Sequence, residues 1–109
     1  MISLTALVLS FNERENIERT IAALAWVPEV LIIDSFSTDE TIALATNVRS
    51  DIRVLQREFD SFADQCNYGL SQIKTEWVLS IDADYVITPE LAAEIRAVQA
   101  TTQTNGYVA

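Results

Sequence analysis

Short apolar runs alternate with stretches of helical periodicity along the chain. Residues 4–9, 30–33, 52–55 and 77–81 are runs typical of buried strands. Between them, apolar residues recur every three or four positions, which indicates amphipathic helices. Strands that alternate with helices predict an α/β fold built on a mostly parallel sheet. Residues 106–109 have the pattern of a further strand at the point where the chain stops.

Polar residues at the borders of the periodic stretches predict where the helices begin. Asn12 and Ser37 are each followed three positions later by Glu, which is the spacing of a capping box. Thr88 before Pro89 is typical of a helix start. The apolar positions expected to face the core are Ile17, Ile21 and Leu24; Ile42 and Ala45; Phe62, Cys66, Leu70 and Ile73; and Leu91, Ile95 and Val98.

Composition narrows the class of protein. A chain of 109 residues suits one domain, and 50% hydrophobic residues exclude intrinsic disorder. No apolar run approaches the about 18–20 residues of a membrane-spanning helix, and no basic segment precedes the first one, so we expect neither a transmembrane segment nor a signal peptide. The abrupt end within a strand pattern predicts that residues 1–109 form a single domain that is incomplete at its C-terminus.

Charge and missing residue types restrict the chemistry. Sixteen acidic against seven basic residues give a net charge of −9, which repels nucleic acids. The chain has no histidine, so an imidazole base or a zinc–histidine site cannot be built from it. A metal would meet carboxylate and carbonyl oxygens, which select Mg²⁺, Mn²⁺ or Ca²⁺. The single cysteine, Cys66, excludes a disulfide framework, fits a reducing compartment and is expected to be a buried structural thiol.

Three polar segments follow predicted strands. They are residues 10–13, 34–39 and 82–84. In parallel α/β sheets ligands bind at the carboxyl ends of the strands, so we expect the three segments to converge on one crevice if their strands are neighbours. Asp82 and Asp84 would repel each other without a cation, which favours a divalent metal there.

Each of these segments also has a purely structural interpretation. Asp82 and Asp84 could serve only to form the turn that leads to the next helix. Phe11 could stack on a nucleobase or simply pack over the first helix. Asp34 and Asp39 could be a turn residue and a helix-start acid, and Ser37 is better explained as a cap than as a ligand.

The motifs together resemble a known family. Three motifs occur along the chain in this order: Leu-Ser-Phe-Asn-Glu, Ile-Ile-Asp-Ser-Phe-Ser-Thr-Asp-Glu-Thr and Trp-Val-Leu-Ser-Ile-Asp-Ala-Asp. Their sequences and order are similar to those of family 2 glycosyltransferases of GT-A fold. Within that family the chain is most similar to the lipopolysaccharide core glycosyltransferase branch, over about residues 4–91. The resemblance implies the Rossmann-like, donor-binding half of a transferase. That enzyme would move sugar from a nucleotide-diphospho-sugar, foremost a UDP-sugar, to an acceptor hydroxyl on a glycan or glycolipid.

The resemblance also implies roles for individual residues. Phe11 would stack on or flank the base, and Asp34 lies in the segment that contacts base and ribose. Asp82 would face the ribose or the metal, and Asp84 would coordinate the Mn²⁺ or Mg²⁺ that bridges the phosphates. The full predicted nucleotide-sugar site is Ser10, Phe11, Asn12, Glu13, Asp34, Asn67 and Asp82, with Asp84 and Asp82 at the metal. No catalytic residue is predicted, because the family's acceptor half and catalytic carboxylate lie beyond this chain's last residue.

The chain departs from the family pattern at three positions. Ser35 stands where many relatives have a second Asp, and Phe36 stands where Gly is usual, so we expect a reshaped turn. Cys66 replaces a basic residue ahead of Asn67, which removes a cation from the phosphate side. Arg57 is a candidate to compensate for that loss.

Two other functions remain open from the sequence. One is a non-catalytic module that binds nucleotides or docks a partner. The other is a Mg²⁺-dependent phosphatase of the haloacid-dehalogenase type, because Asp82-x-Asp84-x-Val86 matches its motif, although no lysine follows Asp84. For the transferase, the branch implies a cytoplasmic protein, peripheral at the inner face of the membrane.

Overall fold

Strands and helices alternate through the structure, a computed structural model that describes residues 3–101 and 106–108. The elements are β1 (Leu4–Ser10), α1 (Ile17–Ala22), β2 (Glu29–Asp34), α2 (Thr41–Val48), β3 (Arg53–Gln56), α3 (Phe62–Ser71), β4 (Trp77–Asp82), α4 (Pro89–Thr101) and β5 (Gly106–Val108). Each predicted strand is present, and so the α/β prediction is confirmed. None of these helices is long and apolar enough to cross a lipid bilayer.

All strands of the sheet run parallel, in the order β3-β2-β1-β4-β5. The central strand β1 pairs with β2 on one side and with β4 on the other, so the order reverses there. Such a reversal is where open α/β sheets bind ligands, outside the carboxyl ends of the strands. The register sets Ser10 beside Asp34 and Leu9 beside Asp82, which brings three predicted site segments to one edge.

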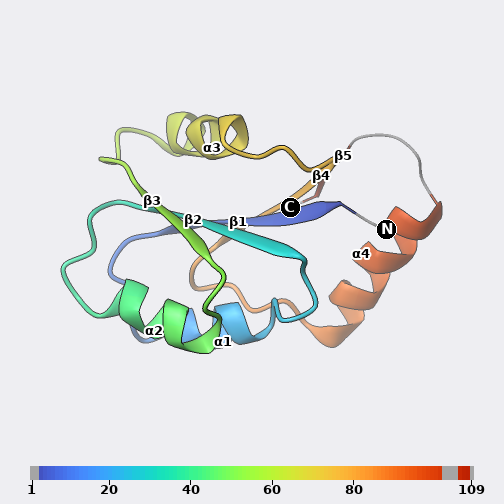
Figure 1. Ribbon diagram of the computed structural model, residues 1–109, viewed down its shortest axis with the longest axis horizontal. Coiled ribbons are helices and arrows are strands. Elements are labelled where there is room, and N and C mark those ends of the chain that lie inside the picture. Colours follow the sequence, from blue (N-terminus) through green and yellow to red (C-terminus); the bar gives the residue numbers. More distant parts are fainter. Residues whose placement is uncertain (1–2, 102–105, 109) are drawn as a thin grey trace.

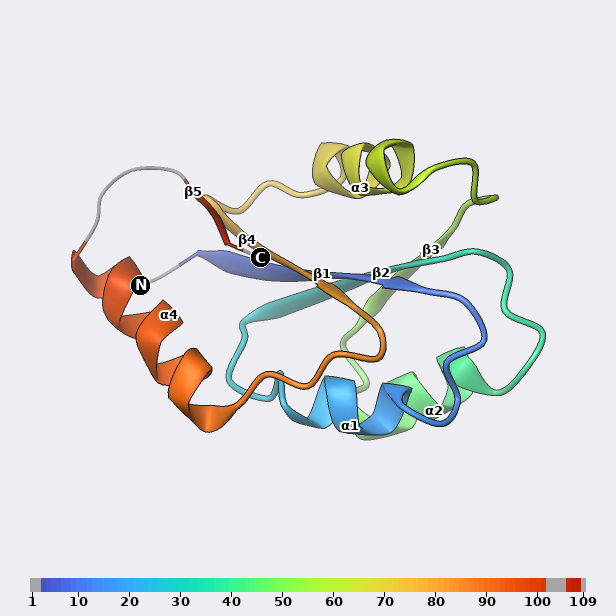
Figure 2. The ribbon, with the colours of Figure 1, turned by 180° about the vertical axis from the view of Figure 1, so that it is seen from behind.

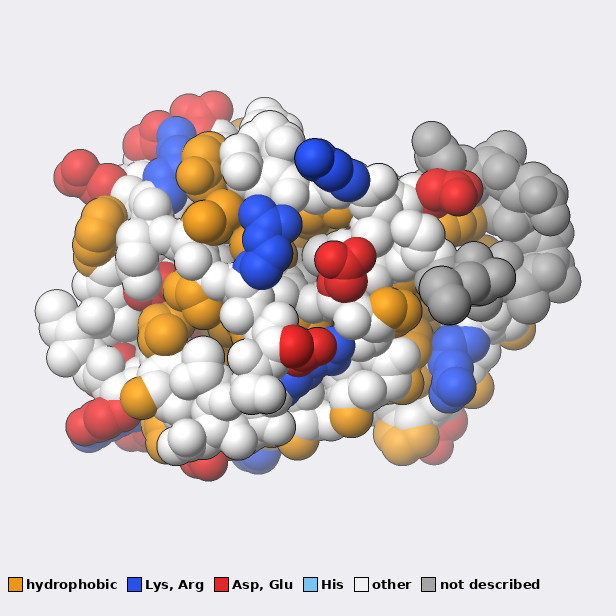
Figure 3. All heavy atoms as spheres, in the orientation of Figure 1, with side chains coloured by type: hydrophobic (Ala, Val, Ile, Leu, Met, Phe, Trp, Pro, Cys, Tyr) orange, Lys and Arg blue, Asp and Glu red, His pale blue; other side chains and the backbone are white. Residues whose placement is uncertain are grey.

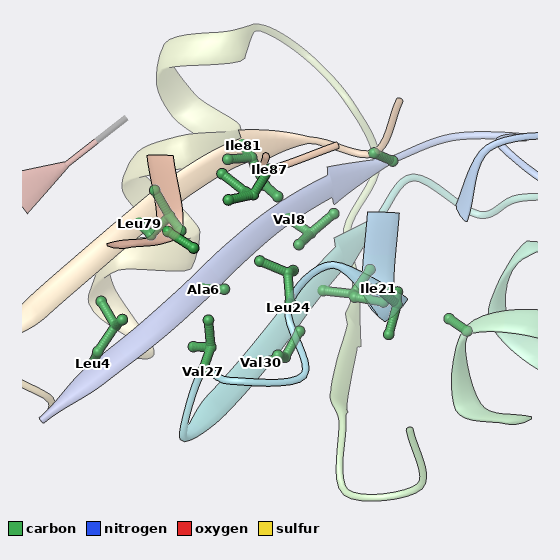
Figure 4. Close-up of a cluster of buried hydrophobic side chains, with 14 of the residues drawn as sticks. Leu4, Ala6, Val8, Ile21, Leu24, Val27, Val30, Leu79, Ile81 and Ile87 are labelled. Carbon is green, nitrogen blue, oxygen red and sulfur yellow. The ribbon is translucent and has the colours of Figure 1, made fainter. Parts of the chain in front are cut away.

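Helices cover both faces of the sheet. Helices α1, α2 and α4 lie on one face and α3 lies alone on the other (Figures 1 and 2). Because side chains alternate along a strand, β1 sends Leu4, Ala6 and Val8 into the larger core and Leu7 into the smaller one under α3. Figure 4 shows that larger core, where strand side chains meet Ile21 of α1 and Leu24 of the turn after it. Its residues are aliphatic almost throughout.

Helix α3 approaches the sheet closely at a glycine. A Cβ added to Gly69 would lie 2.6 Å from Cδ1 of Leu7 and 3.3 Å from Cγ1 of Ile33. Both of those side chains are buried in the smaller core, so they have little room to move. The missing side chain at position 69 therefore sets how near α3 lies to the strands.

Two apolar positions that we predicted to face the core are exposed instead. Phe62 is 66% exposed and Val98 is 49% exposed. In α3 the buried positions are Gln65 and Gly69, and Phe62, the first residue of the helix, lines the cavity at the carboxyl edge of the sheet instead of packing on its face. The other predicted inward residues, Cys66 and Leu70 of α3 and Ile73 just after it, do pack against the smaller core.

Helix starts follow the predicted chemistry at some positions and not at others. The Thr88 hydroxyl accepts a hydrogen bond from the N–H of Leu91 at 3.1 Å, so the predicted cap of α4 is confirmed. The predicted caps Asn12 and Ser37 are wrong: α1 begins at Ile17 and α2 at Thr41. The side chains of Asn12 and Ser37 are instead used in contacts between two loops, described below.

Candidate functional site

A cavity of about 530 Å³ opens at the carboxyl edge of the sheet. It lies at the strand-order reversal, because both β1 and β4 end at its wall. Its lining residues are Leu9, Ser10, Phe11 and Glu13 from the end of β1 and its loop; Ser35 after β2; Phe59 in the loop before α3; Phe62 and Gln65 at the start of α3; and Asp82, Ala83 and Asp84 from the end of β4 and its turn. At the left of Figure 3, where the strands finish, acidic and hydrophobic side chains lie close together on the surface.

The end of β4 and its turn have a fixed backbone and two exposed carboxylates. The N–H of Ala83 donates to the carbonyl of Leu9 at 3.1 Å. Its carbonyl accepts a 2.6 Å hydrogen bond from the hydroxyl of Thr20, a fully buried residue of α1. Both backbone groups of Ala83 are therefore used, and Asp82 and Asp84 on either side are exposed at the cavity.

The buried side chain of Asp34 joins the end of β1 to the loop after β2 by hydrogen bonds. Its carboxylate is fully buried and accepts hydrogen bonds from the hydroxyl of Ser10 at 2.7 Å and that of Ser37 at 2.6 Å. The N–H of Ser37 donates to the second carboxylate oxygen at 2.8 Å. Such bonds offset the cost of burying a charged group. Asp34 does not line the cavity, so in this structure it supports the site rather than faces a ligand.

Further hydrogen bonds join the same two loops at the surface. The backbone N–H of Asn12 donates to the hydroxyl of Ser37, and its side-chain oxygen accepts from the N–H of Thr38, both at 2.8 Å. The N–H of Glu13 donates to the hydroxyl of Thr41, also at 2.8 Å. We call residues 10–13 and 34–41 the hydrogen-bonded wall of the cavity.

We call the part of the cavity formed by residues 57–65 the aromatic wall. Phe59 and Phe62 pack edge to face, with ring centroids 5.4 Å apart and planes at 81°. The four phenylalanines of the chain, Phe11, Phe36, Phe59 and Phe62, are all at least 48% exposed, and three of them line the cavity. An aliphatic core with exposed aromatic rings around one cavity is typical of a binding site for a ring-shaped ligand.

Arg57 is held within the aromatic wall. Its guanidinium donates to Asp60 at 3.0 Å and to the side-chain oxygen of Gln65 at 2.8 Å, and it lies 5.5 Å from the ring centroid of Tyr68. The hydrogen bond with Asp60 raises the pKa of Arg57 and lowers the pKa of Asp60. Arg57 does not line the cavity, so the structure gives no support to the idea that it replaces the missing phosphate-side cation.

The lining of the cavity is acidic. Glu13, Asp82 and Asp84 contribute carboxylates, whereas no lysine or arginine is among the lining residues in the described part of the chain. The described residues contain no cluster of three or more His, Cys, Asp or Glu side chains that could enclose a metal. Two exposed carboxylates are nevertheless the donor set with which Mg²⁺-like ions bind when ligand phosphates complete the coordination. The residues present therefore fit a divalent ion that arrives with a phosphorylated ligand.

Most of the predicted site residues meet at this cavity. Ser10, Phe11, Glu13, Asp82 and Asp84 line it. Asn12 and Asp34 lie behind it in the hydrogen-bonded wall, and Asn67 is exposed on α3 away from the lining.

Sequence reasoning missed the aromatic wall. Phe59 carries no signal that separates a site residue from a loop residue, and Phe62 fits the helical stripe predicted to face the core. The sequence pattern does not distinguish Gln65 from other polar positions of a helix. Ser35 was noted only because relatives have Asp there, and its place in the lining is an addition from the structure.

The turn after β2 contains an unusual backbone conformation. Phe36 has a φ of 56°, in the left-handed region that favours glycine. We expected Phe to reshape a turn in which Gly is usual, but the residue adopts the glycine-like conformation instead. Its N–H is held by the side-chain oxygen of Gln56 at 2.9 Å, and its ring is 58% exposed.

Comparison with known proteins identifies the family of the chain. The family model described as Glycosyl transferase family 2 matches residues 5–108. An uncharacterized glycosyltransferase of Rickettsia felis is 31% identical over 110 aligned residues, which cover 100% of this chain and 38% of the relative. The lipopolysaccharide core biosynthesis glycosyltransferase LpsC of Rhizobium meliloti is 31% identical over 86 residues, or 76% of this chain and 32% of LpsC. The chain thus spans about a third of the length of the curated relatives it matches.

A solved structure with the same fold is glucosyl-3-phosphoglycerate synthase of Mycobacterium tuberculosis. It superposes with a TM-score of 0.72 over 94% of this chain and 41% of the synthase, at 22% sequence identity. That crystal structure contains Mn²⁺, uridine diphosphate and glucosyl-3-phosphoglycerate. At this identity the likeness shows the GT-A fold, which the sequence predicted.

Proposed function

The chain belongs to glycosyl transferase family 2, and from that premise we propose that it is the part of a glycosyltransferase that binds a nucleotide-diphospho-sugar. The observation that carries the proposal is one cavity, at the strand-order reversal, lined by exposed aromatic rings on one side and by Asp82 and Asp84 on another. The rings suit a nucleobase, and the carboxylates suit the metal that accompanies a diphosphate. The haloacid-dehalogenase alternative has no comparable support, because the match to family 2 covers residues 5–108.

A divalent ion is needed to reconcile this acidic cavity with an anionic ligand. A diphosphate next to Glu13, Asp82 and Asp84 would be repelled, and no basic side chain in the described lining offsets that charge. Mn²⁺ or Mg²⁺, held by Asp84 and Asp82, would bind the phosphates and stabilise the charge that develops on the leaving diphosphate. The mycobacterial synthase with Mn²⁺ and uridine diphosphate supports this choice of ion and makes a UDP-sugar the first donor to test.

The likeness to LpsC supports a role in making lipopolysaccharide or another cell-surface polysaccharide. The acceptor would then be a hydroxyl of a glycan or glycolipid, and the protein would work in the cytoplasm, at the inner face of the membrane. Transfer itself requires an acceptor site and a catalytic carboxylate, neither of which we assign within these residues. The chain tested alone is therefore expected to bind the donor without turnover.

The test is calorimetric titration of UDP, GDP and CDP with and without Mn²⁺. We expect one nucleotide to bind only with Mn²⁺, and Asp84→Asn to weaken that binding at least tenfold, since it removes a charged metal ligand but keeps the shape. Glu90→Gln, an exposed acid outside the cavity lining, is the matched control and should bind as the wild type does. Binding that ignores Mn²⁺ or Asp84 would contradict the metal assignment. A folded chain that binds none of the nucleotides would favour the partner-docking module.

A further inference from the structure

We propose that Gln65 is a positioning residue that makes the hydroxyl of Ser35 a hydrogen-bond donor to a carbonyl oxygen of the donor's nucleobase. This inference rests on the proposed function and adds to it the polar contact by which the base is recognised. Gln65 is 1% exposed at the first turns of α3, and Ser35, directly after β2, lies within hydrogen-bond distance of it. Both residues line the cavity.

Arg57 determines which way the amide of Gln65 points. A guanidinium has only donors, so the atom of Gln65 that lies 2.8 Å from Nη1 of Arg57 must be its oxygen. The amide nitrogen then faces the opposite way, where it lies 3.0 Å from Oγ of Ser35 and 3.2 Å from the carbonyl of Arg57. Each amide hydrogen therefore has an acceptor, and reversing the amide would bring two donors together.

The polarity of Ser35 follows from that of Gln65. A hydroxyl has one hydrogen to donate and two lone pairs to accept with. Since the amide of Gln65 donates to Oγ of Ser35, one lone pair is occupied and the hydroxyl hydrogen is directed elsewhere. Among the described residues no protein acceptor takes that hydrogen. The backbone N–H of Ser35 is already used by the carbonyl of Ser10, at 3.0 Å, which fixes the residue at the strand end.

The cavity that Ser35 lines suits a base at this residue rather than a phosphate. Three of its lining side chains are aromatic rings, Phe11, Phe59 and Phe62, and none in the described part of the chain is a lysine or an arginine. Aromatic rings bind flat rings through their faces, and they offer a phosphate no compensating charge. A carbonyl on the edge of a base, such as one of the two in uracil, would accept the Ser35 hydrogen while the ring contacts phenylalanine.

Gln65→Glu tests the inference because it reverses the hydroxyl without removing it. A carboxylate only accepts, so it keeps the contact with Arg57 but takes the hydrogen of Ser35 for itself. We expect UDP affinity in the presence of Mn²⁺ to fall roughly three- to tenfold, which corresponds to one hydrogen bond. Ser35→Ala should have a similar effect. In the double variant Ser35→Ala/Gln65→Glu, the second change should add nothing, because it acts only through Ser35.

The control ligand is inorganic pyrophosphate with Mn²⁺, which has no base. Its affinity should stay within twofold in all three variants, so a loss for both ligands would reveal a general charge or folding effect and overturn the inference. Thermal unfolding checks the fold, and if Gln65→Glu does not fold, Ser35→Ala decides the matter with the two ligands. UDP binding unchanged in Ser35→Ala, or additive losses in the double variant, would also overturn it. A wild-type chain that binds no nucleotide would instead overturn the proposed function on which the inference rests.

Discussion

The two walls of the cavity are built by different means. In the hydrogen-bonded wall, hydrogen bonds of the buried Asp34 and of Asn12 at the surface join the loops after β1 and β2. In the aromatic wall, Phe59 and Phe62 contact each other, and their loop is held by the group of contacts around Arg57. One wall is fixed by many polar contacts between two loops. The other is held by contacts among residues 57–68, and two hydrogen bonds join it to the first wall, from Gln65 to Ser35 and from the N–H of Arg57 to the carbonyl of Asp34.

This difference predicts different roles for the two walls in stability and in ligand binding. Groups held by several hydrogen bonds are pre-organised, so a ligand that meets them loses little further entropy on binding. Exposed rings with few neighbours can adjust to the ligand, but ordering them costs part of the binding energy. We therefore expect changes in the hydrogen-bonded wall to affect stability strongly, and changes in the aromatic wall to affect binding more than stability.

Asp34→Ala should give the largest effect. It leaves two hydroxyls and one N–H without their acceptor in a buried place, so we expect a loss of about 3 kcal/mol in the free energy of unfolding. Urea denaturation measures it. Glu40→Ala, which removes an exposed acid paired with Arg14 at 3.4 Å, is the control and should cost under about 1 kcal/mol. Equal losses in the two variants would contradict the role given to Asp34.

Gly69→Ala tests how the aromatic wall is attached to the sheet. The added Cβ would meet buried Leu7 at 2.6 Å, so α3 or the core must shift, at a cost of about 2 kcal/mol. Asn67→Ala on the exposed side of the same helix is the control, and it should be neutral or slightly stabilising, since Ala favours helix. A Gly69→Ala variant as stable as the wild type would show that α3 can move away from the sheet freely.

Phe36→Gly should stabilise the hydrogen-bonded wall. The left-handed conformation costs an L-residue about 1 kcal/mol, and glycine adopts it without that penalty. The comparison to make is with Phe36→Ala, which also removes the exposed ring but keeps the Cβ. Thermal denaturation should find the glycine variant more stable than the alanine variant, and the reverse order would mean that the strain is absent in solution.

Lowering the pH should have the smallest effect on the free energy of unfolding, and one carboxylate of each wall should contribute to it. The Thr41 hydroxyl lowers the pKa of Asp39, and the Arg57 guanidinium lowers the pKa of Asp60, from an ordinary value of 3.8. A lowered pKa in the folded state adds stability above pH 3.8 that is lost as the pH falls through the folded value. Asp60→Asn should therefore flatten the decline in unfolding free energy below about pH 4. Glu58→Gln, from the same loop, is the control, and an equal change in both variants would contradict the assignment.

The sequence was sufficient for the strands and for part of the site. The hydrophobic pattern predicted that Ser10, Phe11, Asp82 and Asp84 lie at strand ends, and the strand order, which the pattern does not give, brings them to one cavity. The aromatic wall could not be predicted. Periodicity shows that Phe62 lies on the apolar stripe of a helix, but it does not show whether the side chain contacts the core or a ligand. The supporting role of Asp34 was equally hidden, since burial depends on which loops pack above a strand end.

The hydrogen bond between Thr20 and the carbonyl of Ala83 has a consequence for redesign. Ala83 is 3% exposed and both its backbone groups are used, so the frame of the turn depends on helix α1 and on β1 rather than on the two acids. The side chains at positions 82 and 84 can then be exchanged for other oxygen or nitrogen donors while their backbone stays in place. At the proposed metal site, the preference for one ion over another would then be a property that can be altered separately from the fold.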